Sequence, residues 1–464
     1  MNLPQVLLSI ANDLNLHNAK AVLVGGAVRD FLLQKELKDY DIEVYNLDSI
    51  EQLEVILSKY GSVNLVGKSF GILKLKVESI EYDFSFPRKE QKNGIGHRGF
   101  DVEIDSNLSF IEASKRRDFT INAMGYDIIK KEILDPFRGL EDLNNRLLKH
   151  IDDKTFIEDP LRVYRAVQFC ARFDLELDES TFNVCKKMVE DGDLESLSKE
   201  RVYEEFKKLL LKSHKPSIGL NLMRELGILK YFPELEAIIG VPQSPVWHPE
   251  GDVWTHTLMA VDKMSIELTK ERYKELSQRD RLKFMFAILC HDFGKPSCTR
   301  YKEDGKLTSI GHEEAGVEPT KSFLQRFTND VKLIDSILPL VEYHLRPVIY
   351  YHNKAKDSTI KRLATKVNIE DLVLVSKADN LGRATQDAIE GKCPAADWLL
   401  KKAKELKVDK KPIEPILQGR DLIKLGLKPS PKFQQIIDNI YQEQIDGNIK
   451  TKDDAIEFVK KRLN

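Results

Sequence analysis

The sequence predicts an α+β fold, in which a small head with a mixed sheet and helices precedes a long all-α remainder. Short apolar segments that alternate with polar residues, as strands do, occur between residues 20 and 86. From about residue 140 onward, apolar residues recur at helical spacing and strand signals nearly vanish. The 464 residues are enough for about three or four domains.

The head is expected to fold around a glycine turn. Gly25 and Gly26 interrupt an apolar strand, and a helix is expected directly after them, over 28–33. Residues 87–100 are polar, basic and contain glycine, which is typical of a mobile loop. The expected strands are 21–24, 41–45, 72–77 and 81–86.

The remainder of the chain is predicted to be helical. Residues 158–173 and 199–212 have the apolar spacing of amphipathic helices. Proline-rich segments at 241–249 and 410–415 indicate boundaries. The predicted domains are 1–140, 141–238, 239–405 and 406–464.

Composition excludes several classes of protein. The chain has 72 Lys and Arg against 74 Asp and Glu, which argues against a globally basic nucleic-acid coat protein but leaves room for local basic surfaces. The five cysteines show no CxxC spacing, so reduced cytoplasmic thiols are expected and a zinc ribbon is not. The longest apolar run, 284–290, is far shorter than the ~20 residues of a membrane span. The first residues lack the basic region of a signal peptide.

Two aspartates at the start of the second expected strand have the spacing of a metal site. Asp39 and Asp41 are two residues apart, so on a strand their side chains share a face, about 6.5–7 Å apart. Such carboxylates can hold divalent cations, which in nucleotidyl transfer activate the attacking hydroxyl and neutralise the triphosphate. Asp83 on a later strand is expected to complete the site or act as a base. The glycine turn lets a phosphate approach the backbone and the following helix N-terminus.

Five motifs follow one another in the first half of the chain. They are GGAVRDFLL with DYD, KRRDFTINAM (115–124), LDPFRGLEDL (134–143), EDPLRVYRAVQFCARF (158–173) and LSKERVYEEFKKLL (197–210). In this order they resemble the family of class II tRNA nucleotidyltransferases and bacterial poly(A) polymerases, within the polymerase-β-like superfamily. The resemblance covers residues 18–235 and implies a polymerase-β-like nucleotidyltransferase head followed by a helical neck. The nucleotide-binding residues that we expect are Gly25, Gly26, Arg29, Arg117, Asp118, Asp159, Arg162 and Arg165.

The fourth motif contains a pair that can select a base without a nucleic-acid template. Asp159 and Arg162 are neighbours at i and i+3 of the expected helix. A carboxylate accepts from an exocyclic amine and a guanidinium donates to ring acceptors, so the pair fits C and A and rejects U and G. An ordinary intrahelical ion pair is the alternative. Arg165, one turn further, is expected to meet the triphosphate, and Gln168 stands where the family commonly carries a third arginine.

A local excess of positive charge follows this motif. Residues 199–230 contain eight Lys and Arg against four Glu. This excess suits an RNA acceptor stem that is bound through its backbone. A solvated helix face is the alternative for each lysine.

Histidines mark a second site. Six of the ten histidines fall between residues 248 and 352. His256 in DVWTHTL, His291 and Asp292 in ILCHDFGKP, and Asp379 in KADN follow one another in the order H, HD, D. This order resembles the HD phosphohydrolase superfamily and implies one divalent cation bound by these four side chains.

Three further residues of this region are candidates for the same chemistry. His312 in IGHEEAG and His344 in VEYH are extra imidazoles of the kind that hold a second metal or contact a phosphate. Lys295, three residues after Asp292, is a candidate for a phosphate contact, and a surface lysine is the alternative.

A nucleotidyltransferase head joined to an all-α HD domain resembles the bacterial multifunctional CCA-adding enzymes. The resemblance implies template-independent addition and repair of the 3′-terminal CCA of tRNA from CTP and ATP. It also implies a phosphatase and 2′,3′-cyclic phosphodiesterase in the HD domain. The expected partner is the 3′ end and acceptor stem of tRNA, bound by a cytoplasmic monomer or homodimer, and the tail 406–464 is expected to support the tRNA or the dimer.

The two sites are expected to differ in metal. Mg²⁺ is expected in the head, because hard carboxylates and phosphates favour it. The metal of the HD domain stays open among Mg²⁺, Mn²⁺, Ni²⁺ and Co²⁺, because mixed His and Asp ligands tolerate all of them.

Several alternatives stay open. In a bacterial poly(A) polymerase the segment 66–75 usually carries a doubled basic pair and a histidine, whereas this chain has Ser69 and Lys74, which favours tRNA. A CC-adding or A-adding specialist would differ in the loop 87–100, whose basic residues are Arg88, Lys89, Lys92 and Arg98. The alternative from a different class is an HD phosphohydrolase whose head only binds RNA. The converse is a nucleotidyltransferase with an inert HD domain.

Overall fold

The computed structural model of the chain describes residues 1, 3–37, 39–66, 71–92, 100–428 and 432–463. The chain forms two compact units. One comprises Met1–Leu209 and Ile218–Ile228, and the other comprises Leu210–Ser217 and Leu229–Asn464. The division into four domains stays a prediction.

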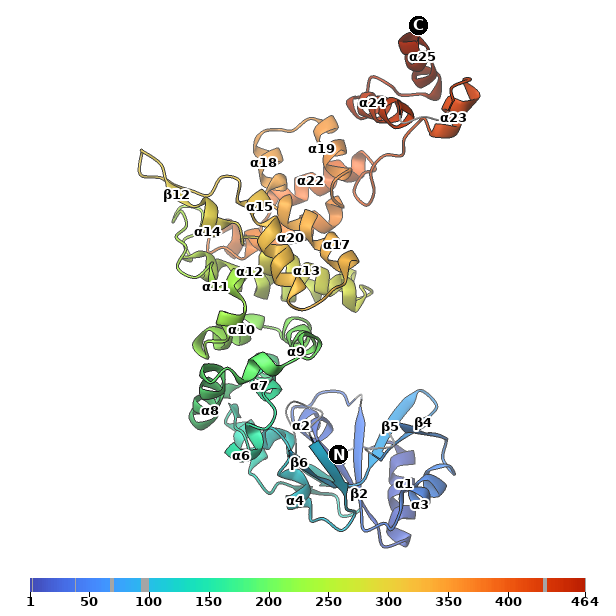
Figure 1. Ribbon diagram of the computed structural model, residues 1–464, viewed down its shortest axis with the longest axis vertical. Helices are drawn as coiled ribbons and strands as arrows, with labels where there is room; N and C mark the ends of the chain where they lie inside the picture. Colours follow the sequence, from blue (N-terminus) through green and yellow to red (C-terminus); the bar gives the residue numbers. More distant parts are fainter. Residues whose placement is uncertain (2, 38, 67–70, 93–99, 429–431, 464) are drawn as a thin grey trace. The chain divides into compact units, whose positions relative to one another are not determined.

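A seven-stranded mixed sheet forms the head within the first unit (Figure 1). Its strand order is β3-β4-β5-β2-β1-β8-β9, in which β2 and β5 are parallel and the other neighbouring pairs are antiparallel. The predicted α+β head with a mixed sheet is therefore confirmed. The strands are β1 (Lys20–Val24), β2 (Tyr40–Tyr45), β3 (Ser62–Val66), β4 (Ile72–Val77), β5 (Ile80–Ser85), β8 (Gly125–Asp127) and β9 (Glu132–Leu134).

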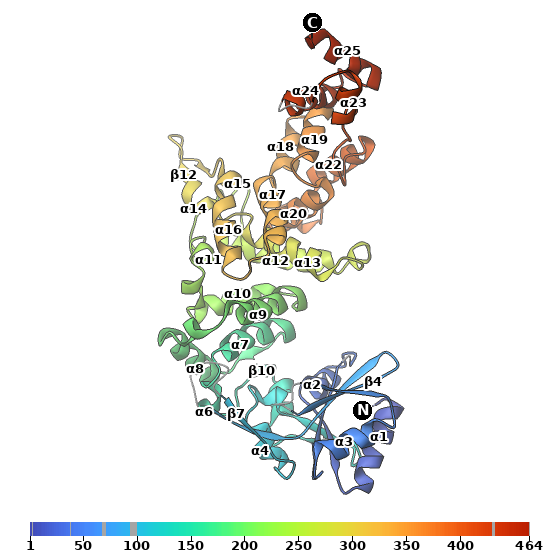
Figure 2. The same cartoon turned by 45° about the vertical axis from the view of Figure 1, so that its right-hand side comes forward.

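Three helices support this sheet. α1 (Gln5–Leu16) packs against β1 and beside α3 (Ile50–Leu57), as Figure 2 shows. α2 (Gly26–Leu32) begins directly at the end of β1, where Gly25 is its N-terminal cap residue. Because β1 is antiparallel to β2, with Leu23 opposite Ile42, this turn lies beside the first residues of β2.

The expectation of a loop over residues 87–100 is wrong at both of its ends. β6 (Arg88–Lys92) pairs with β7 (Phe100–Ile104) in antiparallel register, with Arg88 opposite Ile104. Residues 93–99, which include Arg98, lie outside the described residues. The segment escapes prediction because a hairpin is stabilised mainly by its ladder of backbone hydrogen bonds, which needs no apolar alternation in the sequence.

The remainder of the first unit and the connection to the second are helical. The predicted helix over 158–173 begins three residues later than expected, because Pro160 occupies its N-terminal cap position. The helix predicted over 199–212 has the expected bounds. These helices are α4 (Phe110–Ser114), η1 (Thr120–Asn122), α5 (Gly139–Asn144), α6 (Asp153–Phe156), α7 (Leu161–Phe173), α8 (Glu179–Glu190), α9 (Lys199–Lys212) and α10 (Pro216–Glu225).

The second unit is built around buried helices, as the predicted all-α HD domain requires. Phe284–Cys290, the longest apolar run of the chain, is buried along its whole length within α13. α13 packs against α12, α17 and α20. The main helices are α12 (Val253–Leu268), α13 (Gln278–Cys290), α15 (His312–Ala315), α16 (Val317–Gln325), α17 (Val331–Glu342), α18 (Arg346–His352), α19 (Asp357–Ala364), α20 (Ile369–Leu381) and α22 (Pro394–Glu405). A hairpin of β12 (Arg300–Tyr301) and β13 (Leu307–Thr308) interrupts them.

The C-terminal segment has a small core of its own. α23 (Gly419–Lys424), α24 (Lys432–Asp446) and α25 (Lys452–Leu463) enclose Leu422 and Ile440. No helix in the described part of the chain is both long and apolar enough to cross a membrane.

Candidate functional site

A cavity of about 610 Å³ in the first unit gathers most of the predicted nucleotide-binding residues. Eight arginines and one lysine line it, against three aspartates, so its surplus of positive charge suits a triphosphate. The predicted residues that line it are Gly25, Gly26, Arg29, Asp41, Arg117, Asp118, Asp159, Arg162 and Arg165.

Two of the three predicted metal carboxylates lie side by side. Asp41 on β2 is the direct partner of Asp83 on the parallel strand β5. Burial raises the pKa of Asp41, and the negative charge of Asp83 raises it further. The Nζ atom of Lys74, on the other neighbour of β5, lies 3.1 Å from Asp83 Oδ2. Asp39 is exposed immediately before β2, and its charge also raises the pKa of Asp41.

These carboxylates fit a divalent cation. Two acids on adjacent strands repel each other when both are ionised, and after burial this repulsion is the second cause of the raised pKa of Asp41. A cation between them would relieve it, and oxygen ligands are those that Mg²⁺ prefers.

Gly25 brings the backbone close to this site. Its φ of +68° lies in the region that L side chains rarely adopt. A Cβ atom on Gly25 would lie 3.1 Å from Arg117 Nη1 and 3.9 Å from Asp41 Oδ2. Only glycine therefore leaves room between the metal carboxylate and the arginine, as the glycine motif predicts.

A buried carboxylate that the sequence reading missed holds two of the arginines. Glu43, two residues after Asp41 on β2, is 1% exposed. Its Oε1 atom accepts hydrogen bonds of 3.0 Å from both Arg116 and Arg117, and its Oε2 atom accepts one of 2.7 Å from the Tyr45 hydroxyl. The signal was present in the sequence, because Glu43 continues the alternation of Asp39 and Asp41 on one strand face.

Asp118 is buried and forms an ion pair with Arg165. Its Oδ2 atom accepts a 2.7 Å hydrogen bond from Arg165 Nε, and its Oδ1 atom accepts one of 2.9 Å from Asn122. Burial alone would raise the pKa of Asp118, but Arg165 and the hydrogen bond from Asn122 hold it below its ordinary value. Arg165, which was expected to meet the triphosphate, is thus anchored by Asp118.

Arg29 is held at the back of the cavity. Its guanidinium donates to the Asn122 side chain and, over 2.9 Å, to Asp30, and lies 4.2 Å from the centre of the Phe173 ring. The guanidinium is 4% exposed, so its orientation is set by the fold.

The side chains of Asp159 and Arg162, which were expected to be neighbours on one helix, bind other groups, although the Arg162 backbone N–H donates to the Asp159 carbonyl over 3.0 Å. Asp159 lies two residues before α7 and accepts hydrogen bonds of 2.9–3.0 Å from Arg201 of α9. Arg162 donates to the backbone carbonyls of Thr155 and Arg116, over 2.7 and 2.6 Å. The alternative of an intrahelical ion pair is therefore not what the structure contains, and both side chains line the cavity.

Gln168 and Arg172 complete the lining from α7. Gln168, at the position of the family's third arginine, is 1% exposed and its Oε1 atom has no hydrogen-bond partner. Arg172, one turn later, also lines the cavity, which places a cation near the position where the family arginine is missing.

The basic segment 199–230 is only partly free to bind RNA. Arg201 and Lys208 line the cavity. Lys207 donates to Glu204 over 2.8 Å and Lys208 to Glu205 over 2.7 Å. Two of the eight cationic side chains of this segment therefore line the cavity.

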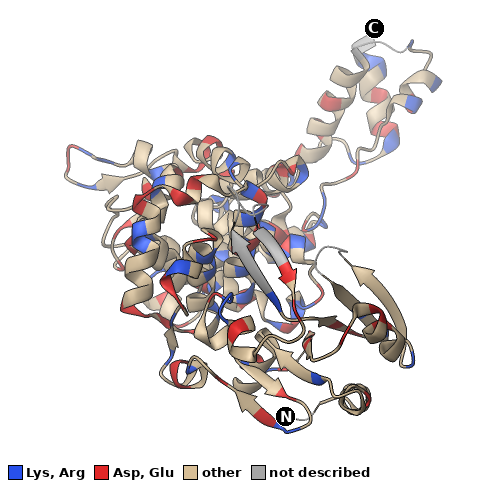
Figure 3. Ribbon diagram, turned by 60° about the horizontal axis from the view of Figure 1, so that its bottom comes forward, with Lys and Arg blue, Asp and Glu red and all other residues tan. Residues whose placement is uncertain are grey.

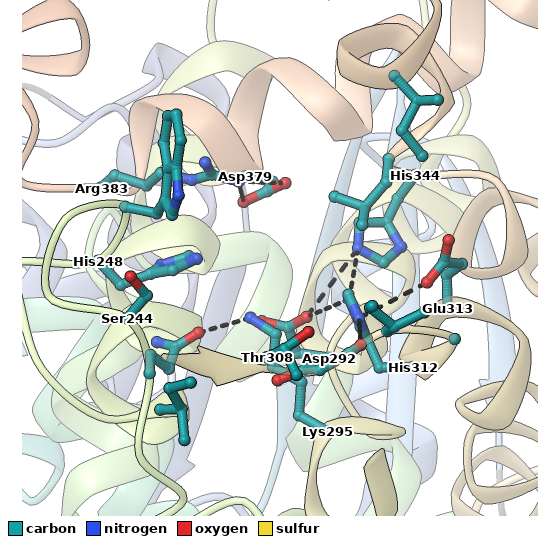
Figure 4. Close-up of a pocket in the computed structure, with 18 residues that line it drawn as sticks. Ser244, His248, Asp292, Lys295, Thr308, His312, Glu313, His344, Asp379 and Arg383 are labelled. Atoms are coloured by element: carbon teal, nitrogen blue, oxygen red, sulfur yellow. Dashed lines mark hydrogen bonds and ion pairs between the residues drawn. The ribbon is translucent and has the colours of Figure 1, made fainter. Parts of the chain in front are cut away.

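The described part of the second unit contains three groups of metal-ligand type. One consists of His248, Glu250 and His256, and the other two consist of predicted residues. His256, His291 and Asp379 form the first of these two, and each offers a ligand atom within 4.8 Å of the others. Asp292, His312 and His344 form the second. All six predicted residues are buried, and Figure 4 shows Asp292 between Asp379 on one side and His312 and His344 on the other.

The hydrogen bonds of these histidines leave the Nε2 atom of each ring available to a metal. The Nδ1 atoms of His291, His312 and His344 each lie 2.7 Å from a backbone carbonyl oxygen, which can only accept. Each Nδ1 therefore donates to its carbonyl. His312 Nε2 and His344 Nε2 lie 3.3 Å apart, so both could bind one cation.

In the first group, the two ring nitrogens of His256 are arranged in the same way. His256 Nδ1 lies 2.9 Å from Glu250 Oε1, and its Nε2 atom lies 3.1 Å from Asp379 Oδ1 and 3.3 Å from His291 Nε2. Burial alone would raise the pKa of Asp379, but Arg383 holds it well below its ordinary value, so the carboxylate is charged. Arg383 Nη2 lies 3.1 Å from Asp379 Oδ1.

Asp292 joins the two groups. Its Oδ2 atom lies 3.2 Å from His291 Nε2, and its Oδ1 atom lies 3.2 Å from His312 Nε2. Lys295 Nζ lies 2.7 Å from Asp292 Oδ2 and donates to Gln243 Oε1. The predicted phosphate contact at Lys295 is therefore placed at the same cavity, which measures about 430 Å³.

Two residues of this site, Glu250 and Arg383, were not singled out from the sequence. Glu250 accepts from His248 and from His256, and fixes the tautomer of both rings. Arg383 pairs with Asp379 from one helical turn further along. A carboxylate within a few residues of a candidate ligand was the available signal for Glu250. No pattern indicated Arg383 before the fold was known.

Three segments of the chain match known protein families. Residues 21–149 match the family described as "Poly A polymerase head domain", residues 174–239 match "Probable RNA and SrmB- binding site of polymerase A", and residues 253–384 match "HD domain". A "Multifunctional CCA protein" of Mannheimia succiniciproducens is 33% identical over 374 residues, which cover 78% of this chain and 84% of that protein.

The chain belongs to the family of multifunctional CCA proteins. A second relative of the same name, from Acinetobacter baumannii, is 34% identical over 75% of this chain and 79% of its own length. Two solved structures show the same fold. The Bacillus stearothermophilus CCA-adding enzyme in complex with CTP has a TM-score of 0.66 at 22% identity, covering 100% of this chain and 99% of that one. The Thermotoga maritima enzyme in complex with tRNA has a TM-score of 0.61 at 20% identity, covering 100% and 97%.

Proposed function

We propose that this chain adds C, C and A to the 3′ ends of tRNA from CTP and ATP, without a nucleic-acid template. The observation that carries the proposal is that one cavity of the first unit brings the required groups together. It combines the metal-type carboxylate Asp41, a surplus of cations and the polar pair Asp159 and Arg162. Membership of the family of multifunctional CCA proteins supports the same function.

In this mechanism Asp39, Asp41 and Asp83 hold Mg²⁺. When bound, the metal neutralises the triphosphate and lowers the pKa of the attacking hydroxyl of the RNA. Arg117 and Arg165 are oriented by Glu43 and Asp118 and bind phosphate oxygens bidentately. The Gly25 turn lets the triphosphate approach the backbone.

Base choice rests on Asp159 and Arg162. Arg201 holds the Asp159 carboxylate, which keeps further lone pairs to accept from the exocyclic amine of C or A. The Arg162 guanidinium is fixed by two backbone carbonyls, and its other N–H groups donate to ring acceptors. Both groups are immobilised before the nucleotide binds, which reduces the entropy lost on binding.

The second unit acts on RNA ends as a phosphatase and 2′,3′-cyclic phosphodiesterase. His256, His291, Asp292 and Asp379 would hold one divalent cation, and His312 and His344 with Asp292 would hold a second. When bound, the metals would supply Lewis-acid polarisation of the phosphate and activation of a water molecule. Lys295 and Arg383 neutralise the phosphate from within the same cavity. Mg²⁺, Mn²⁺, Ni²⁺ and Co²⁺ all suit this ligand set.

We also propose that the enzyme works in the cytoplasm, as a monomer or homodimer. The tRNA acceptor stem binds through its backbone to the basic residues of 199–230. The free cysteines, most of them buried, suit a reducing compartment.

The decisive experiment uses tRNA that lacks its 3′ end. The chain is incubated with CTP and ATP, separately and together, and the products are resolved by length. The proposal expects two additions from CTP alone and three from the mixture. One addition from ATP only, or two with no third, would indicate an A-adding or CC-adding specialist. Long tails from ATP would indicate a poly(A) polymerase.

Asp41→Asn tests the metal carboxylate in the same assay. The substitution keeps the size of the side chain but removes a ligand charge, so incorporation of labelled CMP should fall by at least a thousandfold. Asp48→Asn, an exposed aspartate of the same unit, is the matched control and should keep full activity. Retained incorporation by Asp41→Asn would contradict the assignment of Asp41 as a metal ligand.

A further inference from the structure

The mouth of the HD cavity carries an exposed tryptophan. The chain has three tryptophans. Trp254 is 2% exposed in the core, and Trp398 packs edge-to-face against Tyr351 at 5.9 Å. Trp247 is 61% exposed and lines the cavity that holds Asp292 and Lys295. The exposed indole face is therefore available to a ligand that binds beside this phosphate-type site.

The backbone of Trp247 is fixed relative to the metal-ligand groups. The N–H groups of Trp247 and of His248 both donate to the Ser244 carbonyl, over 3.1 and 2.8 Å. His248 then lies 2.9 Å from the Glu250 carboxylate that also holds His256. The tryptophan is therefore one residue away from a side chain that is tied into the metal-ligand network.

A second apolar residue borders the same cavity from another segment. Ile310 is 71% exposed and lies two residues before His312. In Figure 4, Ser244 and His248 lie on one side of Asp292, and His312 and Glu313 lie on the other. The cavity thus has a charged floor of metal ligands, Lys295 and Arg383, and an apolar rim contributed by two segments.

We propose that Trp247 stacks on the terminal nucleobase of an RNA whose 3′-phosphate or 2′,3′-cyclic phosphate lies on the charged floor. Ile310 provides a further apolar contact for the base or its ribose. The inference rests on the proposed phosphohydrolase function and names its substrate class: nucleotides with a phosphate on the 3′ side, in preference to phosphate esters without a base. Because every base has a π-face, stacking accepts all four bases, which suits RNA ends trimmed at different positions.

The test compares two substrates of the metal-loaded full chain: a dinucleotide with a 3′-phosphate, and glycerol phosphate, which has no base. Trp247→Ala should lower the ratio of the two kcat/KM values about tenfold, which corresponds to about 1.4 kcal/mol and is typical of one stacked base. Trp247→Phe should restore most of that ratio. The ratio is the informative quantity, because damage to the metal-ligand groups would slow both substrates together and leave it unchanged.

Tyr301→Ala is the matched control. Tyr301 is also an exposed aromatic residue, at 69%, but it lies on β12 and does not line the cavity. Its substitution should leave both kcat/KM values as in the original chain. A ratio that is equally high in Trp247→Ala, or that falls equally in Tyr301→Ala, would overturn the proposal.

A binding measurement separates this inference from the hydrolase function. Titration with cytidine 3′-monophosphate should quench tryptophan fluorescence, and Trp247→Phe should abolish most of the quenching. Quenching without hydrolysis of any ester would contradict the phosphohydrolase function and keep the stacking proposal. Hydrolysis of the dinucleotide with no quenching that depends on Trp247 would keep the phosphohydrolase function and contradict the stacking proposal.

Discussion

Asp118 and Glu43 are carboxylates of the head that the solvent barely reaches, yet both are charged because arginines surround them. Glu43 is bound by Arg116 and Arg117, and Asp118 by Arg165. Removing one partner of such a pair leaves an uncompensated buried charge, which costs far more than a surface ion pair. The cations of the cavity are thus held in place by residues that need not touch the nucleotide.

Asp118→Asn should destabilise the head in a pH-dependent way. The pKa of Asp118 lies below its ordinary value of 3.8 in the folded chain. A lowered folded pKa contributes stability that is fully present above about pH 4 and is lost as pH falls through the folded pKa. We therefore expect Asp118→Asn to lower the free energy of unfolding by about 2–3 kcal/mol at pH 7. The difference in stability between the variant and the original chain should become smaller below pH 4. Thermal midpoints measured by circular dichroism between pH 7 and 3 would show it.

The control for this experiment is Asp48→Asn. Asp48 is exposed in the same unit, so its loss should leave the midpoint nearly unchanged. A gap between Asp118→Asn and the original chain that stays constant down to pH 3 would contradict the assignment of the charge to Asp118.

The choice of base should depend on the side chains of Asp159 and Arg162. The double substitution Asp159→Ala and Arg162→Ala removes the acceptor and the donor that discriminate the bases. Incorporation of UMP relative to CMP should rise by at least tenfold, while triphosphate binding weakens less. Arg201→Ala should have a smaller effect in the same direction, because it only frees the Asp159 side chain.

Primer extension with each of the four nucleotides measures this outcome. Lys207→Ala on α9 is the matched control for Arg201→Ala, because Lys207 pairs with Glu204 and does not line the cavity. Unchanged rejection of UTP by the double variant would refute the role of the pair.

At the scale of elements, both sites are assembled where secondary structures begin or end. Asp41 lies at the start of β2, Gly25 between β1 and α2, and His291 directly after α13. Element ends have unpaired backbone groups and free side-chain directions, whereas element centres are filled by the core. The motifs are short for this reason, since each marks one such end.

Gly25→Ala should damage the head through its turn. The residue has φ 68° and ψ −134°, a combination that only glycine adopts readily, so we expect a loss of about 1–3 kcal/mol in unfolding free energy. The added Cβ would also press on Arg117 Nη1, so KM for CTP should rise severalfold. Chemical denaturation and steady-state kinetics measure the two effects.

Gly192→Ala separates the two effects. Gly192 also has a positive φ, of 84°, and an added Cβ would meet only the Glu195 side chain, at 3.7 Å. It should lower stability and leave KM for CTP unchanged. Equal KM values for both variants would show that the close approach of Gly25 to Arg117 has no role in nucleotide binding.

At the scale of the whole molecule, near-neutral charge results from opposed local concentrations. Figure 3 shows acidic and basic residues interspersed along the helices of both units. The exceptions are the cavities: cations dominate the one in the head, and carboxylates and imidazoles gather at the other. The total of 72 basic and 74 acidic residues therefore says little about RNA binding.

The two chemistries should be separable by one substitution. His291→Ala removes a ligand of the HD site, so metal-dependent phosphatase activity should fall by at least a hundredfold, while CMP incorporation stays within twofold. His352→Ala, an exposed histidine of α18, is the control and should affect neither activity. Loss of CMP incorporation in His291→Ala would contradict the independence of the two sites. If the original chain has no phosphatase activity, the HD domain is inert.

Metal removal provides an independent readout. Chelation should lower the thermal midpoint of the original chain, because a ligand that binds only the folded state stabilises it. The lowering should be smaller in His291→Ala, which has already lost a ligand. Equal lowering in both would mean that the stabilising metal binds elsewhere.

Much of the head could be predicted from periodicity. Residues 72–77 form the strand and residues 199–212 the helix that their patterns predict. The hairpin of β6 and β7 could not be predicted from periodicity, because its sequence is polar and its stability comes from cross-strand pairing. Ser69, one of the residues that favoured tRNA, lies outside the described residues, and the other, Lys74, forms an ion pair with Asp83.

The sequence by itself determined which side chains we propose to carry the chemistry: the aspartates at the start of β2, the motif arginines, and the histidines with Asp292 and Asp379. These groups are recognisable because chemistry restricts residue type and local spacing. Only the tertiary structure decided that Asp159 pairs with Arg201, that Asp292 joins two ligand groups, and that Trp247 stands exposed at the cavity mouth. Those relations join residues that are far apart in the chain or depend on what the fold leaves uncovered. Local patterns do not encode them, and packing does.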